Sequence, residues 1–263
     1  MLIHGFIQKK YEYELKILSK YYFSQNIYEN DLRNKVLEFC NKHMNDFNEV
    51  RYIKMIKRVC RYGENNSLFI VKPVRITQCE IDKIKTLNNL KIEKIAFVLL
   101  VLANINKQSY ILYVRDKIKH IQKINNKKNR LIKVPNISLS YYINEKINSI
   151  FKLAKIYLKK DERNTILRIL IEREFIIMTK KCKYKINFIK HNTEKNSVII
   201  YNFDDFVLEY ERIIGDNIGY CIECKKPIRI RGNNHKMCSD CWKKHRKEYI
   251  NNKVKIFNKK PKK

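Results

Sequence analysis

The 263-residue sequence predicts a mainly α-helical protein of the α+β class that ends in a small cysteine-rich module. Apolar residues recur at helical spacing through most of the first 174 positions. Three short β-prone segments follow within residues 175–201, and two Cys-x2-Cys pairs lie within residues 221–241. These three observations predict a helical region, a small sheet and a separate C-terminal module.

The composition excludes several classes of protein. The chain is 44% hydrophobic and 11% aromatic, with five glycines and four prolines, so it is neither disordered nor collagen-like. Its longest uninterrupted apolar run, residues 95–103, is shorter than the roughly 20 residues that span a bilayer. The first residues lack the basic region and cleavage site of a signal peptide. We therefore expect a cytoplasmic protein without a transmembrane helix.

Residues 1–76 are expected to form a helical N-terminal region. Apolar stripes at helical spacing predict three helices, within residues 11–22, 32–40 and 50–60. Gly63 marks a turn after them, and a short strand is expected at residues 68–71, where Pro73 stops it.

A second domain is expected over residues 77–214. Thr77 and Glu80 have the spacing of a capping box, which predicts that a helix begins there. The next helix is expected at residues 91–105, and it should be central because its middle is apolar on every side. The basic residues 115–133 follow without clear periodicity and are expected to be an insertion in this domain.

Two further helices and three strands complete the predicted domain. The helices are expected at residues 143–158 and 161–174, and the strands at 175–179, 184–189 and 197–201. Three helices followed by three strands indicate a winged helix-turn-helix, with residues 190–196 as the hairpin loop that forms the wing. In such a module the second helix of the turn enters the major groove of DNA.

The predicted recognition helix and wing contain candidate contacts to DNA. These are Arg163, Asn164, Arg168 and Arg173 on the helix and Lys183, Lys185 and Lys195 on the wing. Residues 161–220 nevertheless contain ten basic and ten acidic side chains, so this region is neutral. A neutral surface suits contact with a protein as well as with DNA. The alternative function is therefore a factor that binds a host protein through the winged-helix surface.

Positive charge is concentrated in two segments. The chain has 57 Lys and Arg residues against 26 Asp and Glu residues, a net charge of +31. A bias toward A/T-rich codons explains part of this excess but not its clustering, since residues 115–133 carry a net +7 and residues 221–263 a net +12. Such clusters are typical of solvated loops or tails and of surfaces that bind polyanions. The candidates in the first cluster are Arg115, Lys127, Lys128 and Arg130.

Four cysteines have the spacing of a zinc site. Cys221 and Cys224 form one Cys-x2-Cys pair and Cys238 and Cys241 the other, so that two knuckles can complete a tetrahedral Zn²⁺ site. The module is expected over residues 215–263. Metal binding is expected to supply its folding energy, because residues 221–263 contain few large apolar side chains. Four protein ligands leave no open position, which predicts a structural site in a zinc ribbon or treble clef.

Basic and aromatic residues surround the predicted zinc ligands. The candidates for contact with nucleic acid are Arg229, Arg231, Trp242, Lys243, Lys244, Arg246 and Lys247. The cations would neutralise phosphates, and the indole ring would offer a face on which bases stack. We therefore expect a nucleic-acid partner, with DNA favoured over RNA.

Motifs for enzymatic activity are sparse. The sequence has no Walker loop and no G-x-G-x-x-G, G-x-S-x-G or H-E-x-x-H motif. Asp205 and Glu209 lie one helical turn apart and are a candidate pair for Mg²⁺, although acids in the first turn of a helix also favour its dipole. The sequence therefore favours a protein without enzymatic activity, with a metal-dependent nuclease as the alternative.

The apolar helix at 92–103, the segment 203–210 and the paired cysteine knuckles with their Lys/Arg tail occur together over residues 77–250. This assembly resembles uncharacterised proteins of phages and mobile elements from A/T-rich Firmicutes. The resemblance implies a protein of the host cytoplasm with a role in regulation or replication. It implies no catalytic residue and no particular oligomeric state.

Overall fold

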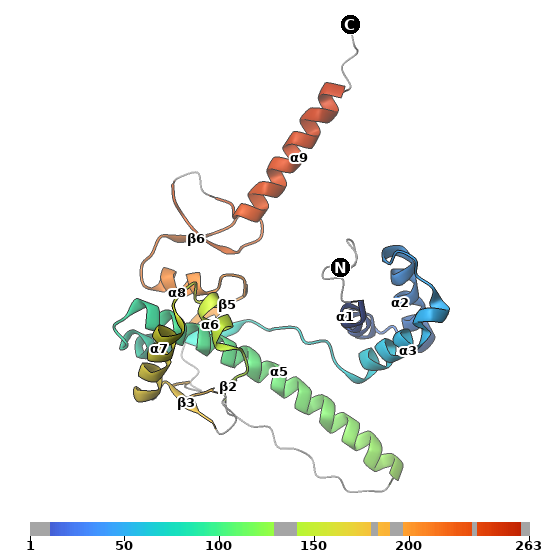
Figure 1. Cartoon of the computed structure of the whole chain (residues 1–263), viewed down its shortest axis with the longest axis horizontal. Coiled ribbons are helices and arrows are strands. Elements are labelled where there is room, and N and C mark those ends of the chain that lie inside the picture. The colour runs from blue at the N-terminus through green and yellow to red at the C-terminus, as the bar shows by residue number, and fades with distance from the viewer. Residues whose placement is uncertain (1–10, 129–140, 180–183, 190–196, 233–235, 259–263) are drawn as a thin grey trace. The chain divides into compact units, whose positions relative to one another are not determined.

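The computed structural model describes residues 11–128, 141–179, 184–189, 197–232 and 236–258 (Figure 1). At residues 120, 123–128, 197, 252 and 254–258 only the backbone is described. The chain is mainly helical with small antiparallel sheets, which confirms the predicted α+β class. It divides into two compact units, Met1–Val71 with Gln108–Leu139 and Lys72–Lys107 with Ser140–Lys263.

The first unit contains the three predicted N-terminal helices. These are α1 (Tyr11–Ser24), α2 (Glu29–His43) and α3 (Glu49–Asn65). Each helix buries one apolar stripe, and the fully buried side chains include Leu15, Leu32 and Ile56. The helical spacing of apolar residues therefore found the core of this unit correctly.

Helices α1 and α3 approach each other closely at Gly63. A Cβ atom on Gly63 would lie 2.1 Å from Ser19 Oγ and 2.8 Å from the backbone carbonyl carbon of Ser19. Ser19 is fully buried, so its backbone has no free space into which it can move. Glycine is therefore required here by the packing of the two helices, not by a turn.

Helix α5 (Leu90–Lys128) is much longer than the predicted 91–105 helix. It continues through the first part of the basic segment, in which the sequence shows no helical period. Its residues up to Lys107 belong to the second unit, and its residues from Gln108 belong to the first. Asp116, the one acidic residue of that segment, accepts hydrogen bonds from the backbone N–H and the hydroxyl of Ser67 at 3.0 and 2.7 Å. This contact joins the extension of α5 to the segment that follows the third N-terminal helix.

The apolar middle of α5 forms the core of the second unit, as predicted. Residues 95–101 and 103 are completely buried. By length and composition Leu90–Lys119 is apolar enough to cross a membrane, and half of its most apolar window is buried within the protein. The core role of this helix explains its hydropathy.

The strand predicted at residues 68–71 is wrong. Strand β1 (Val74–Thr77) instead begins directly after Pro73 and pairs with β5 (Ser197–Ile200) in a two-stranded antiparallel sheet. Helix α4 (Gln78–Lys85) follows and confirms the predicted capping box. Thr77 Oγ1 accepts a hydrogen bond from Glu80 N at 3.3 Å, and a Glu80 carboxylate oxygen accepts one from Thr77 N at 2.8 Å.

A three-stranded antiparallel sheet has the order β2-β4-β3. Its strands are β2 (Tyr142–Ile143), β3 (Ile176–Met178) and β4 (Tyr184–Ile186), with α6 (Ile147–Leu153) and α7 (Lys160–Glu172) between β2 and β3 in the chain. The predicted 143–158 helix is therefore too long at both ends. Its first residue, Ile143, belongs to β2. The helix ends before Lys155, which adopts a left-handed φ of 56°.

The predicted hairpin between segments 184–189 and 197–201 is also wrong. The middle segment pairs with β3 and β2, whereas Ser197–Ile200 pairs with β1. Residues 74–77 were not predicted to form a strand, so the true partner of β5 was missing from the prediction. The predicted wing loop, residues 190–196, lies outside the described residues.

The C-terminal part contains α8 (Val207–Ile213), β6 (Ile218–Tyr220), β7 (Pro227–Arg229) and α9 (Ser239–Asn258). Gly215 follows α8 with a φ of 101°, a left-handed conformation that commonly ends a helix. Residues 215–263, expected as a separate module, belong to the same compact unit as the central sheet. Residues 108–139, which include the expected insertion, belong to the unit of the N-terminal helices.

The Gly63→Ala variant should lower the free energy of unfolding by about 1–3 kcal/mol, the usual cost of overpacking. The gain in helix propensity of about 1 kcal/mol is smaller than the cost of moving the Ser19 backbone. Urea unfolding followed by circular dichroism measures the change. Gly232→Ala is the control, because no atom of the described residues lies within 4 Å of a Cβ there. Equal stability of both variants would contradict the packing at Gly63.

Candidate metal centre

The first cysteine pair lies where β6 turns into β7. Cys221 N donates to Lys226 O at 2.9 Å, and Lys225 N donates to Cys221 O at 3.0 Å. Lys225 adopts a left-handed φ of 57°, which lets the chain reverse within a few residues. The turn therefore presents Cys221 and Cys224 on one side of a short hairpin.

The second pair lies at the start of α9. Trp242 N donates to Cys238 O at 2.9 Å, so the first helical turn places Cys241 next to Cys238. Cys241 N also donates to Cys238 Sγ at 3.4 Å. Ile222 N donates to Lys236 O at 3.0 Å and joins the two segments. Backbone contacts thus bring together cysteines that are 14 residues apart in the sequence.

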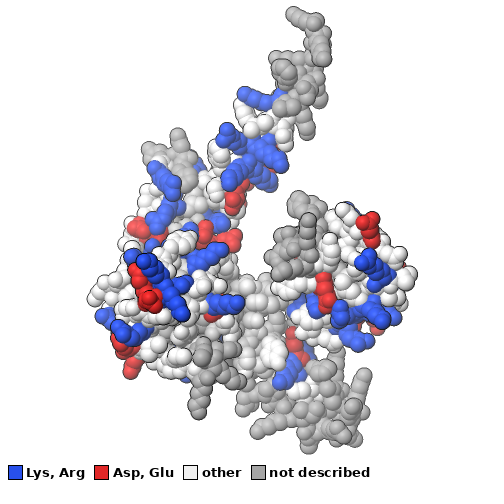
Figure 2. Space-filling view, viewed as in Figure 1, with Lys and Arg blue, Asp and Glu red and all other residues white. Residues whose placement is uncertain are grey.

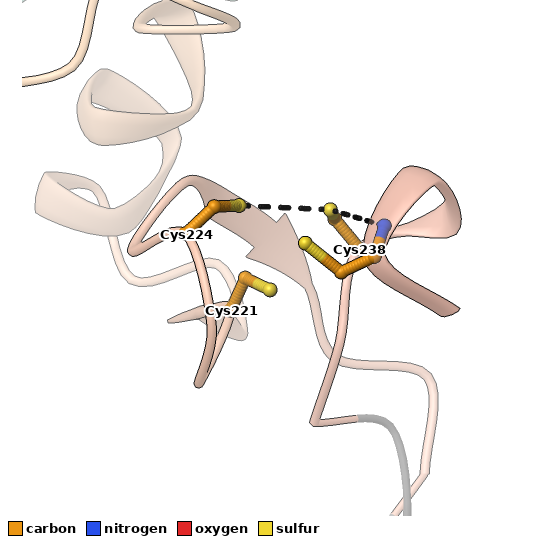
Figure 3. Close-up of side chains that lie close together, drawn as sticks. Cys221, Cys224 and Cys238 are labelled. Atoms are coloured by element: carbon orange, nitrogen blue, oxygen red, sulfur yellow. Dashed lines mark hydrogen bonds between the residues drawn. The ribbon is translucent and has the colours of Figure 1, made fainter. Parts of the chain in front are cut away.

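The four sulfur atoms form one cluster. They all lie within 4.8 Å of one another, and Cys224 Sγ lies 3.7 Å from Cys238 Sγ. Figure 3 shows the sulfur atoms of Cys221, Cys224 and Cys238 turned toward a common centre. Four sulfurs at about 2.3 Å from a zinc ion would be separated by about 3.8 Å. The predicted ligands are therefore close enough to hold a metal ion and are compatible with zinc.

The pKa values of the thiols differ within the cluster. Burial raises the pKa of Cys221, but hydrogen bonds from the backbone N–H groups of Cys224, Cys238 and Glu223 outweigh it and lower the pKa to about 6. Hydrogen bonds with the sulfurs of Cys238 and Cys224 raise the pKa of Cys241 to about 12. Cys221 is therefore a thiolate at neutral pH, whereas a metal ion must displace the proton of Cys241 in order to bind its sulfur.

Buried acids of α8 hold the hairpin against the helical core. Glu211 is 1% exposed, and its carboxylate pairs with Lys94 of α5 at 2.5 Å and with Arg229 of β7. Glu209 accepts hydrogen bonds from Tyr220 Oη at 2.9 Å and from Arg212 Nε at 3.1 Å. The two acids are close together in the sequence, but the sequence does not indicate their partners. Lys94, for example, precedes Glu211 by more than one hundred residues.

These contacts assign intramolecular roles to the residues considered for nuclease activity. Asp205 pairs with Lys155 at 3.1 Å and with Lys226 at 3.8 Å. Glu209 is buried beside Arg212 and Tyr220. Both carboxylates are thus balanced by cations or hydrogen-bond donors of the chain itself.

The predicted basic contacts beside the metal ligands differ in environment. Arg229 pairs with Glu211 and, at 3.8 Å, with Asp216, so it helps to hold the hairpin in place. Arg231 is exposed and pairs with no acid among the described residues. The exposed side chains on α9 include Lys243, Lys244, Arg246 and Lys247, and Figure 2 shows lysine and arginine gathered at the start of this helix.

The candidate DNA contacts on and directly after α7 are less available for binding DNA than those on α9. Arg163 donates to Asn148 Oδ1 at 2.6 Å, and Arg168 lies 3.5 Å from a carboxylate oxygen of Glu172. Arg173 donates to Thr86 O at 3.1 Å, whereas Asn164 is exposed. Lys185 lies half-buried in β4, and Lys183 and Lys195 lie outside the described residues. The arginines of this helix therefore have partners within the protein.

The candidates in the 115–133 segment are only partly described. Arg115 is exposed on α5. Lys127 and Lys128 belong to the helical backbone of α5, but their side chains, and all of Arg130, lie outside the described structure.

Comparison with models of known families, with curated proteins and with solved structures finds no match to this chain.

Replacement of Cys221 by serine should abolish the binding of one zinc ion per chain, because three ligands cannot complete the tetrahedron. Zinc content measured by atomic emission, together with thermal unfolding followed by circular dichroism, checks this result. Cys79→Ser is the matched control, since Cys79 lies on α4, outside the sulfur cluster. A Cys221→Ser variant that retains stoichiometric zinc would contradict this ligand set.

Zinc binding at pH 7 should release at least two protons. Cys241 has a pKa of about 12. The pKa of Cys224 is raised because burial and hydrogen bonding with Cys221 outweigh the N–H of Lys226. Both are therefore thiols that must ionise to bind metal, and affinity should fall as pH falls. Calorimetry in two buffers of different ionisation enthalpy measures the protons. Release of fewer than two would contradict these pKa values.

Proposed function

We propose that the protein binds nucleic acid through helix α9, whose first turn is fixed by a zinc ion. The observation that carries this proposal is the exposure of the helix, because every side chain from Trp242 to residue 251 is exposed. Among the described residues, no acid pairs with Lys243, Lys244, Arg246 or Lys247. Unpaired cations on an exposed helix attract phosphates and release counterions when they bind them.

Aromatic side chains of α9 support the same function. The Arg246 guanidinium lies 5.1 Å from the centre of the Trp242 ring, and Lys253 Nζ lies 4.9 Å from the centre of the Tyr249 ring. Trp242 and Tyr249 remain 49% and 59% exposed. A 20-residue helix is about 30 Å long, so its cations and rings can contact several successive nucleotides.

A treble-clef-like module is the proposed form of the metal site. One cysteine pair comes from a hairpin turn and the other from the start of a long helix, which supports this assignment over a zinc ribbon. The proposed ion is Zn²⁺, because four cysteine sulfurs are a common ligand set for structural zinc. In this arrangement the metal fixes the direction in which α9 leaves the hairpin.

A winged-helix core is the proposed assignment for the central sheet. The element order α5, β2, α6, α7, β3, β4 and the sheet order β2-β4-β3 support it. The proposed wing is the β3–β4 hairpin, not residues 190–196. Because Arg163 and Arg168 of α7 have partners within the protein, α7 is assigned a smaller part in binding phosphates than α9.

The surface around α7 favours a second function, binding of a host protein. Ile171, Ile177 and Met178 are 38%, 44% and 55% exposed on α7 and β3. Apolar side chains beside paired charges suit a protein contact better than a phosphate backbone. The two functions are compatible, since α9 and this surface use different residues.

The proposed context is a phage or mobile element, in which the protein acts in regulation or replication in the cytoplasm of the host cell. DNA is the proposed partner, favoured over RNA. The concentration of cations on an exposed helix supports affinity for a phosphate backbone more strongly than recognition of a base sequence.

Replacement of Lys243, Lys244, Arg246 and Lys247 by glutamine should weaken the binding of duplex DNA. Each lost phosphate contact reduces the slope of log K against log salt concentration by about 0.9, so four contacts account for up to about 3.6. Fluorescence anisotropy over a series of salt concentrations measures both the affinity and the slope.

The matched control removes the same charge from α3, by replacement of the exposed Arg51, Lys54, Lys57 and Arg61 with glutamine. This variant should bind as the native chain does. If the two variants weaken binding equally, net charge and not α9 is responsible. If the native chain shows no salt-dependent binding, the proposed function fails.

A further inference from the structure

A cavity of about 670 Å³ lies beside the first cysteine knuckle. Three aromatic side chains line it, together with polar and charged groups. The residues used below are Tyr201, Asn202, Phe203, Glu209, Tyr220 and Lys225. The volume lies within the usual range of small-molecule sites, so the cavity has room for one nucleoside.

Two of the aromatic side chains at this cavity are exposed to solvent. Tyr201, which follows β5, is 72% exposed, and Tyr220 at the end of β6 is 46% exposed. The hydroxyl of Tyr220 donates to Glu209 at 2.9 Å, which fixes the orientation of its ring. Open aromatic faces, of which that of Tyr220 is held by its hydrogen bond, are suited to stacking with a planar ligand.

The polar groups at this cavity have unused hydrogen-bonding capacity. The side chain of Glu209 is 8% exposed, and Arg212 and Tyr220 both contact its Oε2. Its Oε1 accepts no hydrogen bond from a described residue. Asn202 Oδ1 accepts from Asp204 N at 2.8 Å, which leaves the amide NH₂ without a partner in the described part of the chain. The cavity therefore offers one acceptor and one donor to a ligand.

We propose that this cavity holds one unpaired nucleobase with an exocyclic amino group, such as cytosine, of a single strand bound along the zinc module. Glu209 Oε1 accepts a hydrogen bond from the exocyclic amino group, the Asn202 amide donates to a ring nitrogen or carbonyl oxygen, and Tyr201 or Tyr220 stacks on the ring. Lys225 is exposed at the same knuckle and neutralises an adjoining phosphate. This inference rests on the proposed nucleic-acid binding and deepens it.

The chemistry of the cavity distinguishes cytosine from thymine. The two bases have similar size, but thymine has a carbonyl oxygen where cytosine has its amino group. That oxygen would face the Glu209 carboxylate without a proton between them. A base within a duplex has both faces stacked and its pairing edge occupied, so it cannot enter the cavity. The cavity therefore selects single strands, whereas α9 binds phosphates of either form.

The experiment measures fluorescence anisotropy of the full-length zinc-loaded protein with three labelled probes: oligo-dC and oligo-dT of 12 nucleotides and a 12-base-pair duplex. The native chain should bind oligo-dC several-fold more tightly than oligo-dT. Tyr201→Ala should weaken the binding of oligo-dC by about fivefold or more, the usual effect of a lost stacking contact, and leave duplex binding unchanged. Glu209→Gln should remove the preference for oligo-dC over oligo-dT.

Tyr13→Ala is the matched control, because Tyr13 is a 62% exposed tyrosine on α1. If Tyr201→Ala binds oligo-dC as Tyr13→Ala does, the base site is overturned while binding through α9 stands. If the native chain binds no probe, both the base site and the proposed function fail. Zinc content and circular dichroism identify variants that do not fold. Cytidine monophosphate that displaces oligo-dC at an equal concentration of nucleotide would assign the cavity to free nucleotides and overturn the strand assignment.

Discussion

The buried carboxylate of Glu211 is the charge on which the position of the metal centre depends. A carboxylate that is almost completely removed from water is stable only beside cations, and Lys94 and Arg229 provide two. These cations come from α5 and β7, so one acid on α8 joins the core helix to the hairpin that presents Cys221 and Cys224. Loss of either cation would leave a poorly compensated charge in the interior.

A second buried contact strengthens the same junction. Tyr210 donates to a Glu93 carboxylate oxygen at 2.7 Å, and burial together with this hydrogen bond raises the pKa of Tyr210. Glu209 of α8 and Tyr220 of β6 form a second carboxylate–tyrosine pair. Helix α8 has only seven residues, yet it holds the hairpin through polar contacts and the core through apolar ones. The proposed base cavity borders this rigid junction.

Local patterns in the sequence predicted the local structure well. The capping box at Thr77 and the fully apolar stretch of α5 depend on neighbouring residues, and the structure has both. The proximity of the four cysteines was also predictable. Each Cys-x2-Cys pair supplies two ligands, so two pairs are needed to complete one tetrahedral site.

Pairing between distant segments was not predictable in the same way. The partner of β5 is β1, more than one hundred residues earlier, and a period of two along a strand does not identify its neighbour. The length of α5 was missed because its second half is basic, and its contact with Ser67 through Asp116 joins positions that are 49 residues apart in the sequence. The proposed base site depends on Tyr201, Asn202 and Tyr220, and nothing in the sequence around these residues indicates that the fold brings them together.

The division of α5 between the two compact units affects how the chain can fold during synthesis. Neither unit is continuous in the sequence, since the chain leaves the first at Val71, returns to it at Gln108 and enters the second again at Ser140. The three N-terminal helices therefore leave the ribosome before the α5 segment that completes their unit. A cut between Lys107 and Gln108 would therefore separate the two segments of each unit, so neither half of the chain would contain a complete one.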